Sequence, residues 1–343
     1  MRGWIDFYPI DIMNKRFQVV VTDLVPSNLE AECRILVDIA DVRMVAATTE
    51  DDLAGKVEDA DAVMIYHTMI LSRRTIERLK NCKLIIRCGV GYDNIDHVFA
   101  RSCGIPVANV PDYGTEEVAD TALGMALCLM RGIGFLNVRL RNQQGPWTWR
   151  QVAPLHRLRE RVFGIVGLGR IGTAVAVRAK ALGMAVAFYD PYKPDGYERA
   201  LGIRPLETLA ELLGQAHLVS LHCPLTSETD RLINAAALEQ MPQGSFLVNT
   251  ARGAIVDTTA IPNAIASGRL AGAAIDVLPS EPPLEDDPLL LAWRNPEHPA
   301  HYRVILNPHT AFYSEEGLMD MGVKGAEACR RVLEGLPLRN VVN

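Results

Sequence analysis

Residues 162–191 combine a short apolar run, a glycine-rich turn, a helical pattern and an acidic residue. Residues 162–166 are apolar and are followed by a glycine, which is typical of a strand buried on both faces of a sheet. The glycines have the spacing Gly167-x-Gly169-x-x-Gly172, and helix-forming residues continue from there to 182. A second strand is predicted over 184–189. The order of strand, glycine turn, helix and strand predicts a dinucleotide-binding unit.

The glycine turn suits a pyrophosphate. Gly167 permits the tight turn, Gly169 lets the backbone approach the phosphates, and Gly172 lets the helix lie close to the sheet. The start of the helix offers N–H groups and the positive end of its dipole. Arg170 agrees with this prediction, because a cation in the first turn of a helix is unfavourable unless an anion is near. With Ile171, these residues are the expected phosphate contacts.

Asp190 directly follows the second strand, 18 residues after Gly172. At this place a carboxylate accepts hydrogen bonds from the adenosine ribose hydroxyls and repels the extra phosphate of NADP, so NAD is the predicted cofactor. The alternative is an Asp-Pro pair that only forms a turn. Lys193 keeps NADP open as a possibility.

Composition excludes several classes of function. The net charge of −6 disfavours a nucleic-acid binder, which needs a basic face. The seven cysteines are scattered without a CxxC pair, which indicates reduced thiols and neither a disulfide framework nor a metal site. No apolar run approaches the roughly 18 residues of a membrane helix. Residues 1–15 resemble an extension and not a secretory signal, so a cytoplasmic protein is expected.

Strands alternate with helices along most of the chain, which predicts an α/β fold with two doubly wound parallel sheets of the Rossmann or flavodoxin type and a cleft between the domains. A long helix is expected over 116–140, and a helix capped by Ser72 over 72–79. The predicted substrate domain comprises 1–114 plus 315–343, and the NAD domain 115–314. The predicted strands are 17–22, 42–45, 62–66, 83–87, 162–166, 184–189, 218–222, 245–249, 271–277 and 304–306.

A second glycine-rich loop, Arg87-Cys-Gly89-Val-Gly91-Tyr-Asp93-Asn94, follows the strand at 83–87. Asn94 stands where a third glycine would complete a dinucleotide fingerprint, so a second cofactor site is not predicted. One interpretation is a nest of backbone N–H groups that binds a substrate carboxylate. The other is a tight turn capped by Asp93.

Residues 143–161 contain Trp147 and Trp149, and six arginines lie between Arg139 and Arg161. A loop of this length without regular secondary structure usually has a functional role. Tryptophan and arginine are enriched at interface anchors, which favours a homodimer formed through 116–161. A solvated loop and a nucleic-acid patch are the alternatives.

Three polar residues follow predicted strands, where open parallel sheets bind their ligands. They are Arg252, Glu281 and His309. Histidine suits the proton transfer that accompanies hydride transfer, a carboxylate orients it, and a guanidinium binds a carboxylate with two hydrogen bonds. Together they suit a 2-oxo or 2-hydroxy acid. Equally, His309 could be a core histidine, Arg252 a cation at a helix start and Glu281 a solvated acid.

The chain resembles the NAD-dependent D-2-hydroxyacid dehydrogenases. The motifs that carry this resemblance are Gly167-Leu-Gly-Arg-Ile-Gly172, Asn249-Thr-Ala-Arg-Gly-Ala-Ile-Val-Asp257, Asp276-Val-x-x-x-Glu281-Pro282 and Pro308-His309-x-Ala311. Within the family it is most similar to the C-terminal-binding protein branch. The segments that carry this second likeness are Tyr66-His67-Thr68, Gly91-Tyr-Asp-Asn-Ile-Asp96, Tyr189-Asp-Pro-Tyr192, Leu221-His-Cys223 and Ala311-Phe-Tyr-Ser-Glu315.

The resemblance implies reversible hydride transfer between NAD(H) and C2 of a D-2-hydroxy acid or 2-oxo acid. His309 would be the general acid and base, Glu281 its partner, and Arg252 the substrate-binding residue. It adds cofactor contacts at Cys223, Pro224, Thr229, Thr250, Ala251, Arg252, Asp276 and His309. The implied substrate contacts are Tyr66, His67, Arg87, Val90, Gly91 and Phe312.

Phe312 and Val90 depart from the pattern of that branch, which has a tryptophan and a small polar residue at these places. The substrate preference of the branch is therefore not carried over. The sequence runs to Asn343, and we expect neither the long tail of the animal corepressors nor a regulatory domain, which weakens a phosphoglycerate dehydrogenase interpretation. The alternative function is an NADH-sensing dimeric scaffold with little turnover, because the corepressors of this branch keep the same three residues.

Overall fold

The computed structural model describes residues 16–25 and 28–343, so the predicted N-terminal extension lies outside the described residues. Contacts within the chain define two compact units. One unit comprises the chain up to Tyr113 together with Leu318–Asn343, and the other comprises Gly114–Gly317. The boundaries predicted from the sequence are 114/115 and 314/315.

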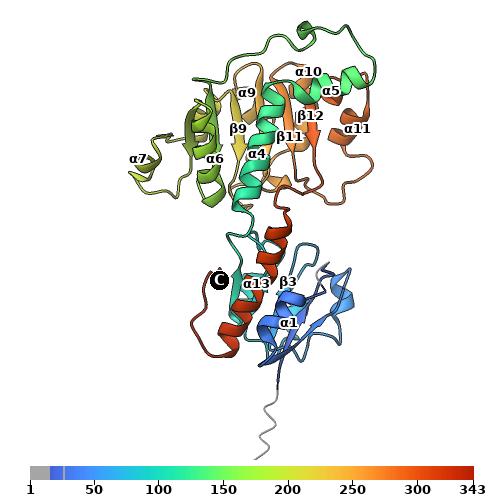
Figure 1. Ribbon diagram of the computed structural model, residues 1–343, viewed down its shortest axis with the longest axis vertical. Helices are drawn as coiled ribbons and strands as arrows, with labels where there is room; N and C mark the ends of the chain where they lie inside the picture. The colour runs from blue at the N-terminus through green and yellow to red at the C-terminus, as the bar shows by residue number, and fades with distance from the viewer. Residues whose placement is uncertain (1–15, 26–27) are drawn as a thin grey trace, which may run out of the picture. The chain divides into compact units, whose positions relative to one another are not determined.

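The first unit is built on a parallel sheet whose strand order is β2-β1-β3-β4-β5. Helices α2 and α3 pack against an apolar core on the sheet. Helix α1 lies beside α13 (Figure 1), where Gly322 of α13 approaches Glu32 of α1. A Cβ atom on Gly325 would lie 2.8 Å from Cys88 Sγ, so this glycine lets α13 approach the sheet closely. The strands are β1 (Phe17–Val21), β2 (Ala40–Met44), β3 (Ala62–Ile65), β4 (Ile85–Arg87) and β5 (Val107–Asn109). The helices are α1 (Glu30–Leu36), α2 (Arg73–Ile76), α3 (His97–Ser102) and α13 (Glu315–Leu333), with a 3-10 turn at Glu50–Leu53.

The second unit contains a parallel sheet whose order is β12-β11-β10-β9-β6-β7-β8. Alternate residues of its strands enter two separate apolar cores, one under α4 and α6 and the other under α8, α9 and α10. Figure 1 shows α4 and α6 side by side on one face. The strands are β6 (Val162–Val166), β7 (Ala185–Tyr189), β8 (Arg204–Pro205), β9 (Leu218–Leu221), β10 (Ser245–Asn249), β11 (Leu270–Ile275) and β12 (Val304–Leu306).

The helices of this unit are short apart from α4 and α6. They are α4 (Thr115–Met130), α5 (Ile133–Arg141), α6 (Arg170–Ala181), α7 (Tyr197–Leu201), α8 (Leu209–Leu213), α9 (Ala235–Gln240), α10 (Ile261–Ala266), α11 (Pro288–Arg294) and α12 (Ala300–Arg303). Three-residue or four-residue 3-10 turns occur at Trp149–Val152, Gly253–Ile255 and Thr258–Ala260. The two parallel sheets confirm the predicted fold class.

Two local predictions are wrong. The helix expected over 116–140 is interrupted at Gly132, which has φ 63° and a Cβ position only 2.1 Å from Val152 Cγ2, and α4 and α5 are bent by 64°. Ser72 precedes α2 but does not cap it, because its hydroxyl donates to the Glu50 carboxylate. Within the described ranges, no single helix passes a length and hydropathy test for crossing a membrane. Taken together, the bent pair α4 and α5 is long and apolar enough for such a crossing, by length and composition alone.

Candidate active site

The glycine turn joins β6 to α6 in the second unit. Gly167 has φ 87°, and a Cβ atom there would lie 2.6 Å from the backbone nitrogen of Cys223. A Cβ atom on Gly172 would lie 2.2 Å from the carbonyl oxygen of Gly167, whereas one on Gly169 would meet nothing within 4 Å. The first and third glycines therefore allow close packing, and the second faces open space that a phosphate can enter.

Asp190 lies beside this turn. Its Oδ2 accepts a 2.8 Å hydrogen bond from the backbone N–H of Leu168, and its Oδ1 accepts one of 3.0 Å from Tyr192 N–H. The hydrogen bond from Tyr192 N–H closes a local turn at Asp190, as the Asp-Pro alternative predicts. Lys193 Nζ lies 4.8 Å from the ring centroid of Tyr197. The carboxylate is thus fixed next to the glycine turn.

The loop after β9 forms another edge of the predicted cofactor site. Burial raises the pKa of the Cys223 thiol to about 11, so the thiol is neutral at physiological pH. Thr229 Oγ1 donates to Pro224 O at 2.6 Å and accepts from Thr226 N–H at 2.8 Å, which makes a compact turn. Burial also lowers the pKa of His222 to about 3, and its Nε2 lies 2.9 Å from Ser220 Oγ.

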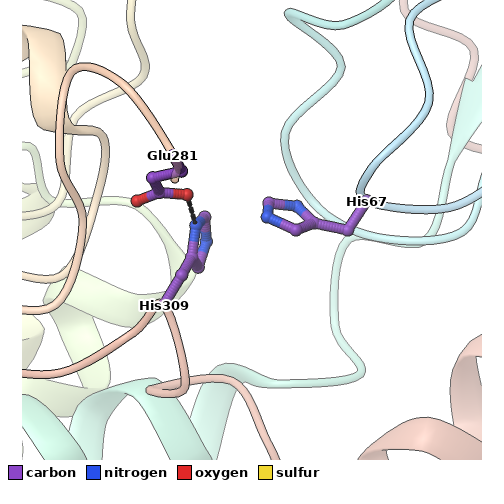
Figure 2. Close-up of side chains that lie close together, drawn as sticks. All are labelled: His67, Glu281 and His309. Carbon is purple, nitrogen blue, oxygen red and sulfur yellow. Dashed lines mark hydrogen bonds and ion pairs between the residues drawn. The ribbon is translucent and has the colours of Figure 1, made fainter. Parts of the chain in front are cut away.

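Arg252, Glu281 and His309 follow three neighbouring parallel strands, β10, β11 and β12. Their carboxyl ends lie at one edge of the sheet. Glu281 Oε2 is 2.7 Å from His309 Nδ1 (Figure 2). Glu281 Oε1 accepts a 2.8 Å hydrogen bond from Leu278 N–H, which holds the carboxylate in its loop. The structure therefore brings together the predicted base and its predicted carboxylate.

Asp276 holds the segment that carries His309. It is 1% exposed, and its carboxylate accepts hydrogen bonds from the backbone N–H of Thr310 at 3.0 Å and of Ala311 at 3.1 Å. Its carbonyl oxygen accepts from His309 N–H at 2.7 Å. His309 has φ 53°, a backbone conformation that is uncommon for residues other than glycine. Burial raises the pKa of Asp276. Asp276 was predicted only as a cofactor contact, and its contacts to the segment that carries His309 were missed.

Asn249 arranges the turn that carries Arg252. It is fully buried, its Oδ1 accepts from Ala251 N–H at 3.0 Å, and its Nδ2 donates to Arg252 O at 2.8 Å. Arg252 Nη1 donates to Ala251 O at 2.8 Å. A Cβ atom on Gly253 would lie 2.0 Å from the carbonyl carbon of Leu278, so this turn packs directly on the loop that leads to Glu281. Thr250 is also buried there.

Phe312 completes the predicted residues of this unit. Its ring contacts the His309 imidazole edge to face, with centroids 6.1 Å apart and planes at 78°. A Cβ atom on Gly114 would lie 3.5 Å from Phe312 Cβ. The ring therefore lies against the predicted base.

The remaining predicted substrate residues belong to the first unit. Asn109 Nδ2 donates to Val90 O at 2.7 Å, which holds the loop at Gly91. Arg87 follows β4, is 5% exposed and donates from Nη1 to Cys88 O at 2.5 Å. Asn94 Nδ2 donates to Met69 O at 2.8 Å, which ties this loop to residues 66–69. Asn94, which breaks the glycine fingerprint, thus has a structural role.

Asp23 organises the loop that contains His67. This carboxylate is 2% exposed and accepts backbone hydrogen bonds from Tyr66 at 2.8 Å, Thr68 at 3.0 Å and Met69 at 2.9 Å. The Tyr66 hydroxyl donates to the buried Glu32 at 2.7 Å, and burial raises the pKa of Tyr66. The sequence analysis missed Asp23. Its signal is an acid directly after the first strand, as with Asp190 and Asp276.

Residues 123–311 match the family model described as D-isomer specific 2-hydroxyacid dehydrogenase, NAD binding domain. Two curated relatives are each 34% identical to the chain. One is D-3-phosphoglycerate dehydrogenase of Methanocaldococcus jannaschii, over 95% of this chain and 59% of the relative. The other is C-terminal-binding protein 1 of Caenorhabditis elegans, over 89% of this chain and 42% of the relative. The chain spans about half the length of these two relatives.

A solved structure of D-lactate dehydrogenase from Aquifex aeolicus, complexed with NAD and lactic acid, is 25% identical to the chain. The likeness covers 92% of this chain and 96% of that chain, with a TM-score of 0.82. The matched family domain includes the glycine turn and Asp190. The predicted NAD-binding domain is therefore confirmed.

Proposed function

Because this chain belongs to the D-isomer-specific 2-hydroxyacid dehydrogenase family, we propose that it transfers a hydride reversibly between NAD(H) and C2 of a D-2-hydroxy acid or 2-oxo acid. The observation that carries the proposal is the 2.7 Å contact between Glu281 and His309, at the sheet edge that also bears Arg252. This arrangement supplies a proton carrier, its orienting carboxylate and a cation for an acidic substrate.

His309 exchanges the proton in this mechanism. Its Nδ1 faces Glu281, so proton exchange with the substrate oxygen takes place at Nε2. In the direction of oxidation, the C2 hydroxyl gives its proton to Nε2 while the C2 hydride leaves. The nicotinamide of NAD supplies the hydride acceptor. In reduction, His309 returns the proton to the oxygen at C2.

Arg252 binds the carboxylate of the substrate and polarises the neighbouring carbonyl through its guanidinium. Asn249 supports this role by fixing the backbone turn on both sides of Ala251. Tyr66, His67, Arg87, Val90, Gly91 and Phe312 stay proposed substrate contacts. The fit to NAD rests on the open space at Gly169 and on the fixed carboxylate of Asp190.

An NADH-sensing scaffold is the second candidate function. The observation that favours it is the 34% identity to C-terminal-binding protein 1 of Caenorhabditis elegans. In this alternative the chain binds the nucleotide and a protein partner, with little turnover.

Oxidation of NADH tests the enzyme against the scaffold. Glyoxylate, pyruvate, hydroxypyruvate, phenylpyruvate, 2-oxo-4-methylthiobutyrate and 2-oxoglutarate are offered in turn, and NADH binding is titrated in parallel. Rapid turnover of one acid is the expected result, and it identifies the side chain that the enzyme accepts. Tight NADH binding without turnover of any of the six would favour the scaffold.

We also propose that two copies of the chain associate through residues 116–161. We further propose that the protein is cytoplasmic. Trp147 is 89% exposed and Trp149 is 72% exposed. No side chain of helix α5 is fully buried: Ile133 is 58% exposed, and Phe135, Leu136, Val138 and Leu140 are half-buried. An apolar cavity of about 560 Å³ lies beside it, lined by Phe135, Val138, Val152, Leu155 and Tyr302 among others. Exposed aromatic and apolar surface of this kind supports association.

A further inference from the structure

Two loops of the second unit are joined by a side-chain hydrogen bond. Tyr192, on the loop after β7, donates its hydroxyl to Glu228 Oε2, on the loop after β9. In the sheet, β6 lies between β9 and β7. The bond therefore connects the loops that leave the two neighbours of β6, the strand that ends in the glycine turn.

Both ends of this connection are fixed by further hydrogen bonds. Tyr192 N–H donates to Asp190 Oδ1 at 3.0 Å. Glu228 N–H donates to Thr226 Oγ1 at 3.2 Å, in the turn that Thr229 closes onto Pro224. Tyr192 is 75% exposed, and an exposed hydrogen bond contributes little to stability. The main effect of the Tyr192 hydrogen bond is that it holds the Glu228 carboxylate in place.

The Tyr192–Glu228 bond brings a second negative charge towards Asp190. The pKa of Tyr192 is raised, first by its hydrogen bond to Glu228, and the negative charges of Glu228 and Asp190 both contribute. The carboxylates of Glu228 and Asp190 therefore both raise the pKa of the Tyr192 hydroxyl. Lys193, the next residue of the loop, has its ammonium over the ring of Tyr197.

We propose that Glu228 is a second determinant of cofactor specificity, which acts with Asp190 to disfavour the 2′-phosphate of NADP. The inference rests on the proposed NAD-dependent function. In this fold the acid after the second strand receives the adenosine ribose. A phosphate on that ribose would place roughly two negative charges near both carboxylates, whereas the hydroxyl of NAD adds no charge. Tyr192 contributes by anchoring Glu228.

Glu228→Gln tests this role, because glutamine keeps an acceptor for Tyr192 and removes the charge. The measurement is the dissociation constant of NADH and of NADPH, followed by nucleotide fluorescence at low and high salt without substrate. We expect NADPH affinity to rise roughly 3- to 10-fold at low salt, with NADH affinity unchanged within about twofold. The gain should shrink as salt screens the charge. Combined with Asp190→Ser, it should exceed the gain of Asp190→Ser alone.

Glu239→Gln is the matched control. Glu239 is exposed and pairs with Arg269, which directly precedes β11, so the same charge is removed at the amino end of the strands. An NADPH-to-NADH ratio in Glu228→Gln equal to that of the control would overturn the inference, as would a gain independent of salt. A wild-type protein that binds neither nucleotide would contradict the proposed function and the inference together. Normal NADH binding with an unchanged ratio would contradict the inference alone.

Discussion

Glu281 Oε2 lies 2.7 Å from His309 Nδ1, and the other oxygen of the same carboxylate accepts from Leu278 N–H. The carboxylate is thus held by its own loop while it contacts the imidazole. A carboxylate anchored in this way fixes the ring orientation, and the proposed proton exchange takes place at Nε2. In the proposed mechanism, Glu281 therefore acts on catalysis through His309 and not on cofactor binding.

Glu281→Gln should lower kcat by roughly 10- to 100-fold, a part of the 10²–10⁴ that general acid–base catalysis typically contributes. NADH affinity should stay within about twofold. Steady-state kinetics and NADH titration check both values. Glu285→Gln removes an exposed charge from the same loop and should behave as wild type. Equal kinetics in the two variants would exclude Glu281 from the mechanism.

Asp276→Asn should weaken the segment that presents His309. Oδ1 of the amide can still accept from Thr310 and Ala311, but an NH2 donor replaces Oδ2 and faces the N–H of Ala311, which costs about 1–3 kcal/mol. We expect a lower free energy of unfolding and a loss in kcat larger than the loss in NADH affinity. Denaturant unfolding and kinetics measure the two effects. Loss of NADH binding with kcat preserved would instead make Asp276 a cofactor contact only.

His222 should make stability depend on pH. Burial lowers its pKa from 6.5 to about 3 in the folded protein. Between these values the unfolded chain binds a proton that the folded chain does not, so the free energy of unfolding falls as pH falls below 6.5. Urea unfolding at pH 7, 6, 5 and 4 should show a shallower decline for His222→Gln. Parallel curves for the two proteins would contradict a neutral, buried imidazole.

The double variant Trp147→Ser/Trp149→Ser should shift the protein from dimer to monomer, because it removes the exposed aromatic groups of the proposed interface. Light scattering after size-exclusion chromatography measures the mass. Leu284→Ser removes an exposed apolar side chain on another loop and should leave the mass unchanged. A monomeric wild type, or an unchanged dimer in the double variant, would argue against this interface.

The parts of the site that follow directly from local pattern were predictable. The glycine spacing, the strand before it and Asp190 lie within one continuous stretch, and the structure has them as expected. Arg252, Glu281 and His309 were also recognisable, because each follows a strand of a parallel sheet. Their neighbouring strands β10, β11 and β12 then place them at one edge.

Tertiary contacts account for what the sequence analysis missed. Asp23 and Asp276 follow strands as Asp190 does, but the backbone N–H groups that they bind lie far along the chain, so the sequence pattern does not identify these partners. The apolar pattern continues across the break between α4 and α5, where Gly132 has φ 63° and lies against Val152. Strands β5 and β8, of three and two residues, were not predicted.

Turnover by His309→Asn tests the proposed role of the imidazole most directly. The assay uses the acid that the wild-type enzyme reduces fastest with NADH, and NADH affinity is titrated on the same samples. Turnover should fall by about 10²–10⁴ while the NADH dissociation constant changes by less than about twofold. Turnover close to that of the wild type would remove His309 from proton transfer and contradict the proposed mechanism.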